Sequence, residues 1–399
     1  MVIAIAGKNN IAVNALEYLA LNYSQHKIVA VCNKDDLGVN LWQRSLRLCA
    51  KNLNIEEVTL DALYSVEDLL FISLEYADII NPARFVSDKL YNIHFSELPK
   101  YKGMYTSVMP ILNNERRSGV TLHRMEPGID TGDILAQKVF DLGIDDTASD
   151  LYNKYLTNAF ELFKENIDEL VNGYDASKEI KQDAELSTYY SKKALDFKNI
   201  CIDLKQTAIA IHNQIRAFNF RQYQLCKVFD MPVVNSIITQ NKSKEKCGSV
   251  IFETEEEFVI ATIDYDLVII KDCFKKVIDA CKENNLDELK KIKYLSYVIN
   301  EKEEHGWTPI VISVYNGNLE MTKYLEKMGA RLDIVNNNGT NLLMYAKDNY
   351  KNSGSAETFE YLYNKGLRFE QKDFYGKDLY EYCEEQGIEK IGNIVAKKN

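Results

Sequence analysis

The residues best suited to chemistry stand in two short segments, one around His94 and one around Asp130. A histidine has an ordinary pKa of about 6.5, which suits proton transfer at neutral pH. A zinc site would need several ligands at close spacing, but His123 lies 29 positions from His94 and the chain has no HExxH sequence. Asp130 and Asp133 have the residue types of a glycosidase pair, yet their spacing on a glycine turn favours one catalyst and one turn residue. We therefore expect proton-transfer chemistry and no metal.

Each segment continues in a definite pattern. The first reads Asn92-Ile93-His94 and then Leu98-Pro99-Lys100-Tyr101-Lys102-Gly103, and the second reads Gly128-Ile129-Asp130-Thr131-Gly132-Asp133-Ile134. In this order, with 36 positions between His94 and Asp130, they resemble the folate-dependent formyltransferase family, which joins an NxH…LPxYxG segment to a GxDTGDI segment. The resemblance covers about residues 65 to 225.

The resemblance implies transfer of a formyl group from N10-formyltetrahydrofolate to an amine. In that reaction an oxyanion develops and the attacking amine must lose a proton. By analogy with the family, Asn92 donates its side-chain amide to the oxyanion, and His94 is the general base toward the amine. Asp130 would orient His94 and favour its protonated form. Gly128 and Gly132 allow the turn that brings this carboxylate close.

The family also holds the pterin of the folate largely through backbone groups. The matching positions are a loop at residues 76–81 and a strand at residues 120–125, although the side chains depart from the usual pattern at Ala77 and Asp78. The implied cofactor-binding residues are Ala77, Asp78, Ile79, Ile80, Leu122 and Met125. Leu122 and Met125 have an alternative interpretation as ordinary core residues of a strand.

Three acceptor amines are familiar in the family: those of an aminoacyl-tRNA, a glycinamide ribonucleotide and a nucleotide-linked amino sugar. Asp and Glu outnumber Lys and Arg by 59 to 48, and the net charge of −11 argues against tRNA and other nucleic acids. Residues 211–225 are similar to the IRAxxFxxYQ segment of sugar N-formyltransferases. This favours a dTDP-linked amino-dideoxy sugar, such as dTDP-3-amino-3,6-dideoxyglucose, used for bacterial surface polysaccharide such as the O-antigen of lipopolysaccharide. Methionyl-tRNA formylation is the alternative, and UDP in place of dTDP stays open.

Aromatic faces can stack a nucleobase, and an arginine can bind phosphate oxygens bidentately. On this basis the candidate substrate-binding residues are Lys102, Tyr105, Tyr190, Arg216, Asn219, Phe220 and Tyr223. The alternative for the segment is an amphipathic helix whose Ile211, Ile215 and Phe218 face the core. Arg216 and Tyr223 fall outside that apolar row, which leaves them for a ligand.

The N-terminal third of the sequence alternates predicted strands and helices. These elements must hold the candidate residues in position. Apolar runs predict strands over Val2–Ala6, Ile28–Cys32 and Leu69–Leu74, with helices over Ala12–Leu21 and Leu41–Leu53. The pattern predicts a doubly wound, Rossmann-like α/β domain with a parallel sheet, whose ligands bind at the carboxyl ends of the strands. Because Gly7 is a lone glycine and not a GxGxxG motif, we reject a dinucleotide site.

The rest of the chain divides into two further parts. Strand-like runs at 248–252 and 258–270 predict a small α+β subdomain that helps to hold the nucleotide. Gly306-Trp307-Thr308-Pro309 begins a segment that resembles the ankyrin repeat, and Gly339 and Gly376 begin two more units, the first 33 residues after Gly306. We expect a catalytic domain at 1–185, the subdomain at 186–275 and all-α ankyrin repeats at 276–399.

An ankyrin stack normally offers a concave face to a partner. The repeats could bind a protein, the second subunit of a homodimer or a regulatory small ligand, and Trp307 is the candidate contact residue. A non-catalytic ankyrin scaffold is a further alternative, which the retained Asn92, His94 and Asp130 disfavour. The eight scattered cysteines indicate reduced thiols, and no apolar stretch is long enough for a membrane span, so we expect a cytoplasmic protein without a membrane partner.

Overall fold

The computed structural model describes residues 1–396 and consists of two compact units. The first unit comprises Met1–Val228 with the short segments Gln240–Lys242 and Thr262–Tyr265. The second comprises Phe229–Thr239, Ser243–Ala261 and the chain from Asp266 onward. The first boundary, at Val228, falls inside the middle subdomain that the sequence predicts.

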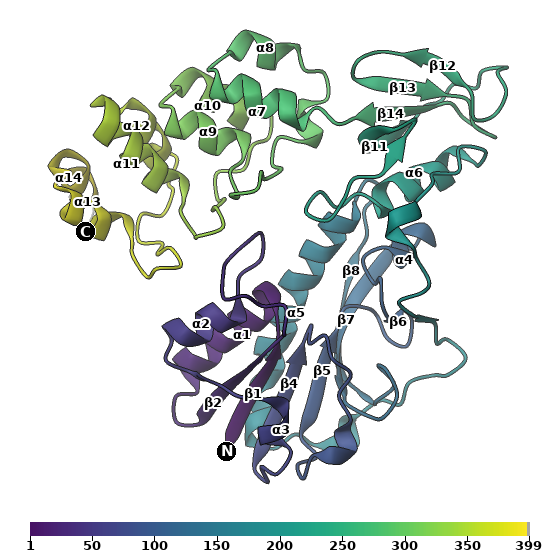
Figure 1. Ribbon diagram of the computed structural model, residues 1–399, viewed down its shortest axis with the longest axis vertical. Coiled ribbons are helices and arrows are strands. Elements are labelled where there is room, and N and C mark those ends of the chain that lie inside the picture. Colours follow the sequence, from purple (N-terminus) through teal and green to yellow (C-terminus); the bar gives the residue numbers. More distant parts are fainter. Residues whose placement is uncertain (397–399) are drawn as a thin grey trace. The chain divides into compact units, whose positions relative to one another are not determined.

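The first unit is built on a seven-stranded sheet in the order β3-β2-β1-β4-β5-β7-β8 (Figure 1). Strands β1 to β5 run parallel, and β7 runs antiparallel to both β5 and β8. The strand order reverses between β1 and β4, and the carboxyl ends of parallel strands at such a point form a ligand crevice. The bounds are β1 (Val2–Gly7), β2 (Lys27–Cys32), β3 (Glu56–Glu57), β4 (Leu69–Leu74), β5 (Leu90–His94), β7 (Arg117–Arg124) and β8 (Ile134–Asp141).

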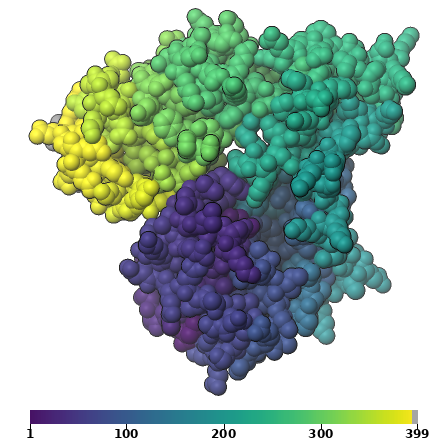
Figure 2. Space-filling model, viewed as in Figure 1, coloured from purple at the N-terminus to yellow at the C-terminus, as the bar shows by residue number. Residues whose placement is uncertain are grey.

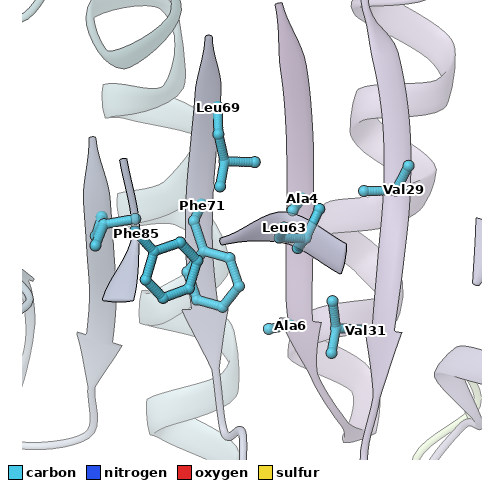
Figure 3. Close-up of a cluster of buried hydrophobic side chains, with 9 residues drawn as sticks. Ala4, Ala6, Val29, Val31, Leu63, Leu69, Phe71 and Phe85 are labelled. Carbon is cyan, nitrogen blue, oxygen red and sulfur yellow. The ribbon is translucent and has the colours of Figure 1, made fainter. Parts of the chain in front are cut away.

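Both faces of the sheet are covered, as the apolar strands require. Helices α1 (Asn9–Asn22), α2 (Leu46–Asn52) and α5 (Ala148–Asn172) lie on one face, where the Tyr18 ring of α1 meets two phenylalanines of α5. The other face carries a cluster closed by the short helix α3 (Leu60–Leu63) (Figure 3). Its buried members are Ala4, Ala6, Val29, Val31, Leu63, Leu69, Phe71, Phe85 and Leu90. Each buried phenylalanine stabilises the fold by about 1.5–3 kcal/mol.

One predicted helix begins later than the sequence pattern suggests. The expected helix over Leu41–Leu53 starts at Leu46. Ser45 caps it by accepting a hydrogen bond from the Leu48 N–H, and the Asp36 carboxylate accepts from Ser45 Oγ and from the Arg47 N–H. These side chains provide hydrogen-bond acceptors for N–H groups in the first turn of the helix, and they hold the preceding residues in a loop.

Short elements complete the first unit. Strands β6 and β9 form a separate parallel pair, and three single-turn 3₁₀ helices join the larger elements. The bounds are η1 (Pro82–Arg84), β6 (Lys102–Gly103), α4 (Met109–Leu112), η2 (Ala176–Lys178), β9 (Tyr189–Tyr190), η3 (Phe197–Asn199), α6 (Ala208–Ala217) and β10 (Lys227–Val228).

The second unit begins with antiparallel strands in the order β11-β14-β13-β12. Their bounds are β11 (Met231–Ile238), β12 (Val250–Glu253), β13 (Glu257–Ile260) and β14 (Leu267–Lys271). The predicted run at 258–270 is therefore two strands and not one. The break lies at Thr262–Tyr265, where Asp264 accepts hydrogen bonds from Thr262 Oγ1 and the Tyr265 N–H and so forms a turn.

Pairs of helices follow the sheet, as expected for ankyrin repeats. They are α7 (Phe274–Lys282) with α8 (Leu286–Lys291), α9 (Pro309–Tyr315) with α10 (Leu319–Lys327), α11 (Leu342–Ser353) with α12 (Glu357–Asn364), and α13 (Leu379–Gln386) with α14 (Glu389–Ala396). The 3₁₀ helix η4 (Leu295–Tyr297) lies between the first two pairs. In Figure 2 the colour of this part of the chain changes from green to yellow in chain order.

The turns before the repeats explain the glycine signature. Gly306 and Gly339 have φ angles of +83° and +82°, which favour glycine. A side chain at Gly306 would also press on Asn337 of the next repeat. The predicted α/β class with a parallel sheet and C-terminal helical repeats is confirmed.

No helix within residues 1–396 has both the length and the apolar character that crossing a membrane requires.

Candidate active site

The three predicted catalytic residues meet at the carboxyl end of β5. Asn92 and His94 are two positions apart on this strand, so their side chains point to the same face. Asp130 lies in the connection between β7 and β8 with a φ of 53°, a left-handed conformation that few residues other than glycine adopt. Gln182 Nε2 holds this turn by donating to the carbonyls of Asp130 and Gly132 at 2.9 and 2.7 Å.

The imidazole of His94 lies between a carboxylate and a carbonyl. Its Nδ1 is 3.5 Å from Asp130 Oδ2, and its Nε2 donates to the Tyr101 carbonyl at 2.9 Å. Asp130 Oδ2 also accepts the Gly103 N–H at 2.9 Å. The predicted pairing of His94 with Asp130 is therefore present in the geometry. To accept a proton at Nε2, however, His94 must first leave the Tyr101 carbonyl.

His123 is a fourth member of the site. It lies opposite Asn92 in the register of β5 and β7 and is 3% exposed. Its Nδ1 donates to the Arg124 carbonyl at 2.8 Å, so Nε2 can accept from Asn92 Nδ2 at 3.0 Å. One N–H of the Asn92 amide is thus anchored and the other is left to donate elsewhere. In the sequence His123 suggests only a possible metal ligand, and nothing there points to this role.

Asp130 stays ionised in this setting. Burial by itself would raise the pKa of Asp130, but the charge of His94 and the hydrogen bond from the Gly103 N–H lower it well below the ordinary 3.8. A lowered carboxylate pKa stabilises the folded protein at neutral pH, and this contribution is lost as the pH falls below the ordinary value. The site therefore presents a fixed negative charge behind the imidazole.

Lys102 is a buried cation beside this carboxylate. It precedes Gly103 in β6 and is 8% exposed, and within the part of the chain that the structure describes its ammonium has no hydrogen-bond or ion-pair partner. Burial lowers the pKa of Lys102, and the charge of Asp130 partly offsets this effect. Such a lysine is suited to binding a substrate that carries negative charge.

A second group of side chains lies at the carboxyl ends of β1 and β4. The rings of Trp42, Phe220 and Tyr223 have centroids 4.8 to 5.4 Å apart, and Tyr152 is 5.8 Å from Trp42. We call these four rings the aromatic cluster. Tyr223 is 65% exposed, which leaves a ring face for a ligand. The structure thus brings together the predicted Phe220 and Tyr223 and adds Trp42.

Glu75 lies beneath the aromatic cluster, directly after β4. Its carboxylate accepts hydrogen bonds from Tyr152 Oη at 2.8 Å and from Asn9 Nδ2 at 3.2 Å. Burial raises the pKa of Glu75, against the lowering effect of these bonds and of Lys8. Glu75 and Asn9 have φ angles of 58° and 64°. Two left-handed residues at adjacent strand ends are typical of a site where geometry matters more than local stability.

The prediction that Arg216 binds phosphate is wrong. Arg216 is 1% exposed, and its guanidinium donates to Asn213 Oδ1 and to the carbonyls of Gly143 and Asp146 at 3.0, 3.3 and 2.9 Å. Burial lowers its pKa to about 10. A guanidinium used in this way ties α6 to the loop before α5 and cannot reach a ligand. Asn219, at 8% exposure, is also buried.

The other predicted substrate residues lie along the β6–β9 pair. The Tyr190 ring stacks on Tyr101 with centroids 6.0 Å apart, and its hydroxyl accepts from Asn113 Nδ2 at 3.2 Å. The Tyr105 hydroxyl donates to the Lys192 carbonyl at 2.7 Å. Both tyrosines stabilise this segment of chain, and their contact with a substrate stays a prediction.

The predicted cofactor residues divide into an exposed loop and a buried strand. Ala77, Asp78 and Ile79 are exposed, with Asp78 Oδ2 2.9 Å from Lys34 Nζ, and Ile80 is half-buried. Leu122 is 1% exposed in β7, as its alternative interpretation expects, and Met125 packs against the cluster of Figure 3. Since the family contacts are mainly to backbone, these residues stay predictions.

Trp307 lies in the second unit, within the repeats. Its ring centroid is 5.2 Å from those of Tyr315 and Tyr345. The three rings form an aromatic group that is half-buried at Trp307, so packing explains the residue at least in part. Its predicted role as a contact residue stays a prediction.

A cavity of about 440 Å³ also lies in the second unit, between the β12–β13 turn and α7. Its lining is mainly acidic, with Glu255, Glu256, Asp272, Asp279 and Glu283. Such a lining would repel a nucleotide diphosphate. The cavity therefore does not compete with the first unit as a nucleotide site.

Family models match most of the chain. The model described as formyl transferase matches residues 1–167, the formyl transferase C-terminal domain matches residues 195–280, and ankyrin repeats (three copies) match residues 277–373. A methionyl-tRNA formyltransferase of Clostridium novyi is 30% identical over 223 residues, which cover 55% of this chain and 71% of that protein.

Two solved structures are more similar in sequence. WlaRD, a sugar 3N-formyl transferase crystallised with dTDP and 5-N-formyl-THF, is 44% identical, with a TM-score of 0.63 over 68% of this chain and 97% of that one. The N-formyltransferase from Helicobacter canadensis, in complex with folinic acid and dTDP-3-aminofucose, is 43% identical, with a TM-score of 0.63 over 68% and 100%.

Proposed function

This chain belongs to the formyltransferase family, and from that premise we propose that it formylates the amine of a dTDP-linked amino-dideoxy sugar, such as dTDP-3-amino-3,6-dideoxyglucose. The observation that carries the proposal is the 44% and 43% identity to two structures described with dTDP or a dTDP-amino sugar. The tRNA-formylating relative is 30% identical. A net charge of −11 also disfavours tRNA as the acceptor.

The formyl donor of the family is N10-formyltetrahydrofolate, which supplies an electrophilic formyl carbon when bound. The residues at the end of β5 fit this group, because Asn92 has an anchored amide with one N–H still able to donate. That N–H can stabilise negative charge on the formyl oxygen as the amine attacks. Such a donor typically contributes about a hundredfold or more in rate.

His94 is the group that takes the proton from the amine. For this step the imidazole carries its own proton on Nδ1, toward Asp130, and the unprotonated Nε2 faces the amine nitrogen in place of the Tyr101 carbonyl. Asp130, 3.5 Å from Nδ1, stabilises the charge that the imidazole then carries. The same imidazole can return the proton to the leaving nitrogen.

The aromatic cluster and two lysines are the groups that bind the dTDP-amino sugar in this proposal. The exposed face of Tyr223 is suited to stacking on a thymine ring. Lys102, beside Asp130, and Lys8, directly after β1, offer positive charge for a diphosphate. Glu75 is placed to accept hydrogen bonds from hydroxyls of a sugar.

We also propose that the enzyme works as a homodimer in the cytoplasm, and that its product is used for bacterial surface polysaccharide such as the lipopolysaccharide O-antigen. The ankyrin repeats bind a protein partner or a regulatory small ligand, with Trp307 as the candidate contact.

A panel of acceptors tests the proposed function. The full chain is incubated with N10-formyltetrahydrofolate and, separately, with dTDP-3-amino, dTDP-4-amino and UDP-4-amino sugars and with methionyl-tRNA. Mass spectrometry detects the gain of one formyl group. We expect formylation of a dTDP-amino sugar, absent in His94→Asn. Formylation of methionyl-tRNA alone would reject the proposal.

A further inference from the structure

The segment that follows η2 forms hydrogen bonds with both loops that contact the proposed base. At its start, Ile180 and Ile134 exchange backbone hydrogen bonds of 2.8 and 2.9 Å at the beginning of β8. At its end, β9 pairs with β6, and the Tyr190 carbonyl accepts the Met104 N–H at 2.8 Å. We call residues 180–190 the strap. It lies wholly within the first unit, so all these contacts belong to one compact body.

Gln182 is the first polar anchor of the strap. Its Nε2 donates to the carbonyls of Asp130 and Gly132 at 2.9 and 2.7 Å. Both neighbours are acceptors, so the amide must face them with its nitrogen. Its Oε1 is then buried, and among residues 1–396 it has no hydrogen-bond partner. A buried acceptor without a partner costs about 1–3 kcal/mol, which the two donated bonds offset.

Thr188 is the second polar anchor. Its Oγ1 accepts the Tyr101 N–H at 2.7 Å, and its carbonyl accepts the Lys102 N–H at 2.9 Å. The Thr188 N–H in turn donates to the Pro99 carbonyl at 3.3 Å. Three hydrogen bonds from one residue therefore hold the loop that carries the Tyr101 carbonyl.

The two residues that contact the His94 imidazole both have a strained backbone. Asp130, whose carboxylate lies 3.5 Å from Nδ1, has a φ of 53°, and Tyr101, whose carbonyl accepts from Nε2 at 2.9 Å, has a φ of 60°. Such a conformation costs a residue other than glycine about 1–3 kcal/mol and persists where the surrounding structure enforces it. The strap forms a hydrogen bond with each of them, through Gln182 and Thr188. One segment thus enforces both conformations.

Gly103 connects the two loops. Its N–H donates to Asp130 Oδ2 at 2.9 Å, and it pairs with Tyr190 of the strap. A Cβ at Gly103 would lie 2.5 Å from the Tyr190 carbonyl oxygen, so the strap lies directly against the backbone at this point. A shift of the strap would therefore move both contacts of the imidazole together.

We propose that the strap sets the orientation of the His94 imidazole, with Gln182 as the positioning residue for Asp130 and Thr188 as the positioning residue for Tyr101. Each acts through the residue that it holds and not on the reacting atoms. A misplacement of about 1 Å at a reacting group can cost about a hundredfold in rate. The inference rests on the proposed function, because it takes His94 as the base.

Gln182→Leu tests the first positioning role. The change removes both donated bonds, and we expect kcat to fall about tenfold while the KM for the dTDP-amino sugar stays within about twofold of the parent value. The matched control is Arg216→Leu, which also removes a donor to two backbone carbonyls and should keep the parent kcat. A Gln182→Leu enzyme with the parent kcat, or with a change in KM alone, would overturn the proposal.

A double variant shows whether Gln182 acts through Asp130. Adding Gln182→Leu to Asp130→Asn should lower kcat by less than about twofold beyond Asp130→Asn alone, because the carboxylate to be positioned is already absent. Full losses that multiply in the double variant would reject the positioning role.

Thr188→Val and Thr188→Ser form a matched pair at the second anchor. Valine lacks the hydroxyl that accepts the Tyr101 N–H, whereas serine keeps it. We expect Thr188→Val to lower kcat about threefold to tenfold and Thr188→Ser to keep the parent kcat. Because Thr188 is exposed, neither change should disturb folding. Leu186→Ala, at a strap position that is 57% exposed, should also keep the parent kcat. Equal kcat values for the valine and serine variants would reject the role of Thr188.

Hydrogen exchange measured by NMR reports on the geometry independently of formylation. The Gly103 amide, which donates to Asp130 Oδ2, should exchange at least about fivefold faster in Gln182→Leu, while the amides of α5 keep their parent rates. Faster exchange at Gly103, with no formylation of any acceptor by the parent chain, would contradict the proposed function alone. Formylation by the parent chain, with unchanged exchange and kcat in Gln182→Leu, would contradict the role of the strap alone.

Discussion

The proposed catalytic residues and the aromatic cluster belong to one unit but are held in different ways. Asp130 is 12% exposed, and the amide of Asn92 is anchored 3.0 Å from His123. Tyr223 is 65% exposed and is held by ring contacts. Groups that act on reacting atoms must be fixed in advance, whereas a ring that stacks on a base tolerates small shifts. Changes at the first region should therefore alter kcat, and changes at the second should alter KM.

The largest effect is expected from His94→Asn. This change removes the base and should lower kcat at least about a hundredfold, while binding of the dTDP-amino sugar stays nearly intact. Turnover kinetics together with titration calorimetry check the expectation. Equal losses of turnover and binding would remove His94 from the role of base and erase the contrast between the two regions.

Asp130→Asn should have the next largest effect. We expect kcat to fall by about tenfold to a hundredfold, because the charge that stabilises the protonated imidazole is lost. The acid-side inflection of the pH–rate profile should move to lower pH. Acid unfolding of the variant should also depend less on pH below about 4, since the lowered pKa of Asp130 no longer contributes. An unchanged profile would argue against the pairing with His94.

Tyr223→Ala tests the other side of the comparison. Loss of one stacking ring should raise the KM for the dTDP-amino sugar about tenfold, with kcat at saturation almost unchanged. Tyr375→Ala is the matched control, because Tyr375 is 68% exposed in the second unit. A fall in kcat with unchanged KM would show that the aromatic cluster acts on the reacting atoms after all.

Arg216→Leu should have the smallest effect on activity. The change leaves the Gly143 and Asp146 carbonyls without their donor, so the free energy of unfolding should fall by about 1–3 kcal/mol. The KM of the folded enzyme should stay at the parent value. Urea unfolding and steady-state kinetics measure the two quantities. A rise in KM without loss of stability would restore the predicted phosphate contact.

The meeting of the three candidate catalytic residues was predictable because its signal is local. Asn92 and His94 share a strand face at a spacing of two, and Asp130 lies in a turn whose glycines are visible in the sequence. His123 was missed because its role depends on the register of β5 against β7. Register across strands 31 positions apart has no signature in a single sequence.

The error at Arg216 has a different origin. Helical periodicity identified the apolar row of α6 but could not show that the loop at Gly143 and Asp146 packs on the polar side as well. Trp42 was missed as a member of the aromatic cluster for the same reason. Trp42 is far from Phe220 and Tyr223 in the sequence, and it contacts them only in the folded protein.

What the sequence determined by itself was therefore whatever depends on neighbours along the chain. Alternating apolar runs set the parallel strands, glycines at a spacing of 33 set the ankyrin turns, and short motifs indicated the candidate reacting groups. The tertiary structure alone decided which polar groups are buried and hydrogen-bonded within the protein and which stay accessible to a ligand. The physical reason is that burial and cross-strand hydrogen bonding depend on segments distant in sequence, so a guanidinium and a tyrosine seven positions apart, Arg216 and Tyr223, end in opposite environments.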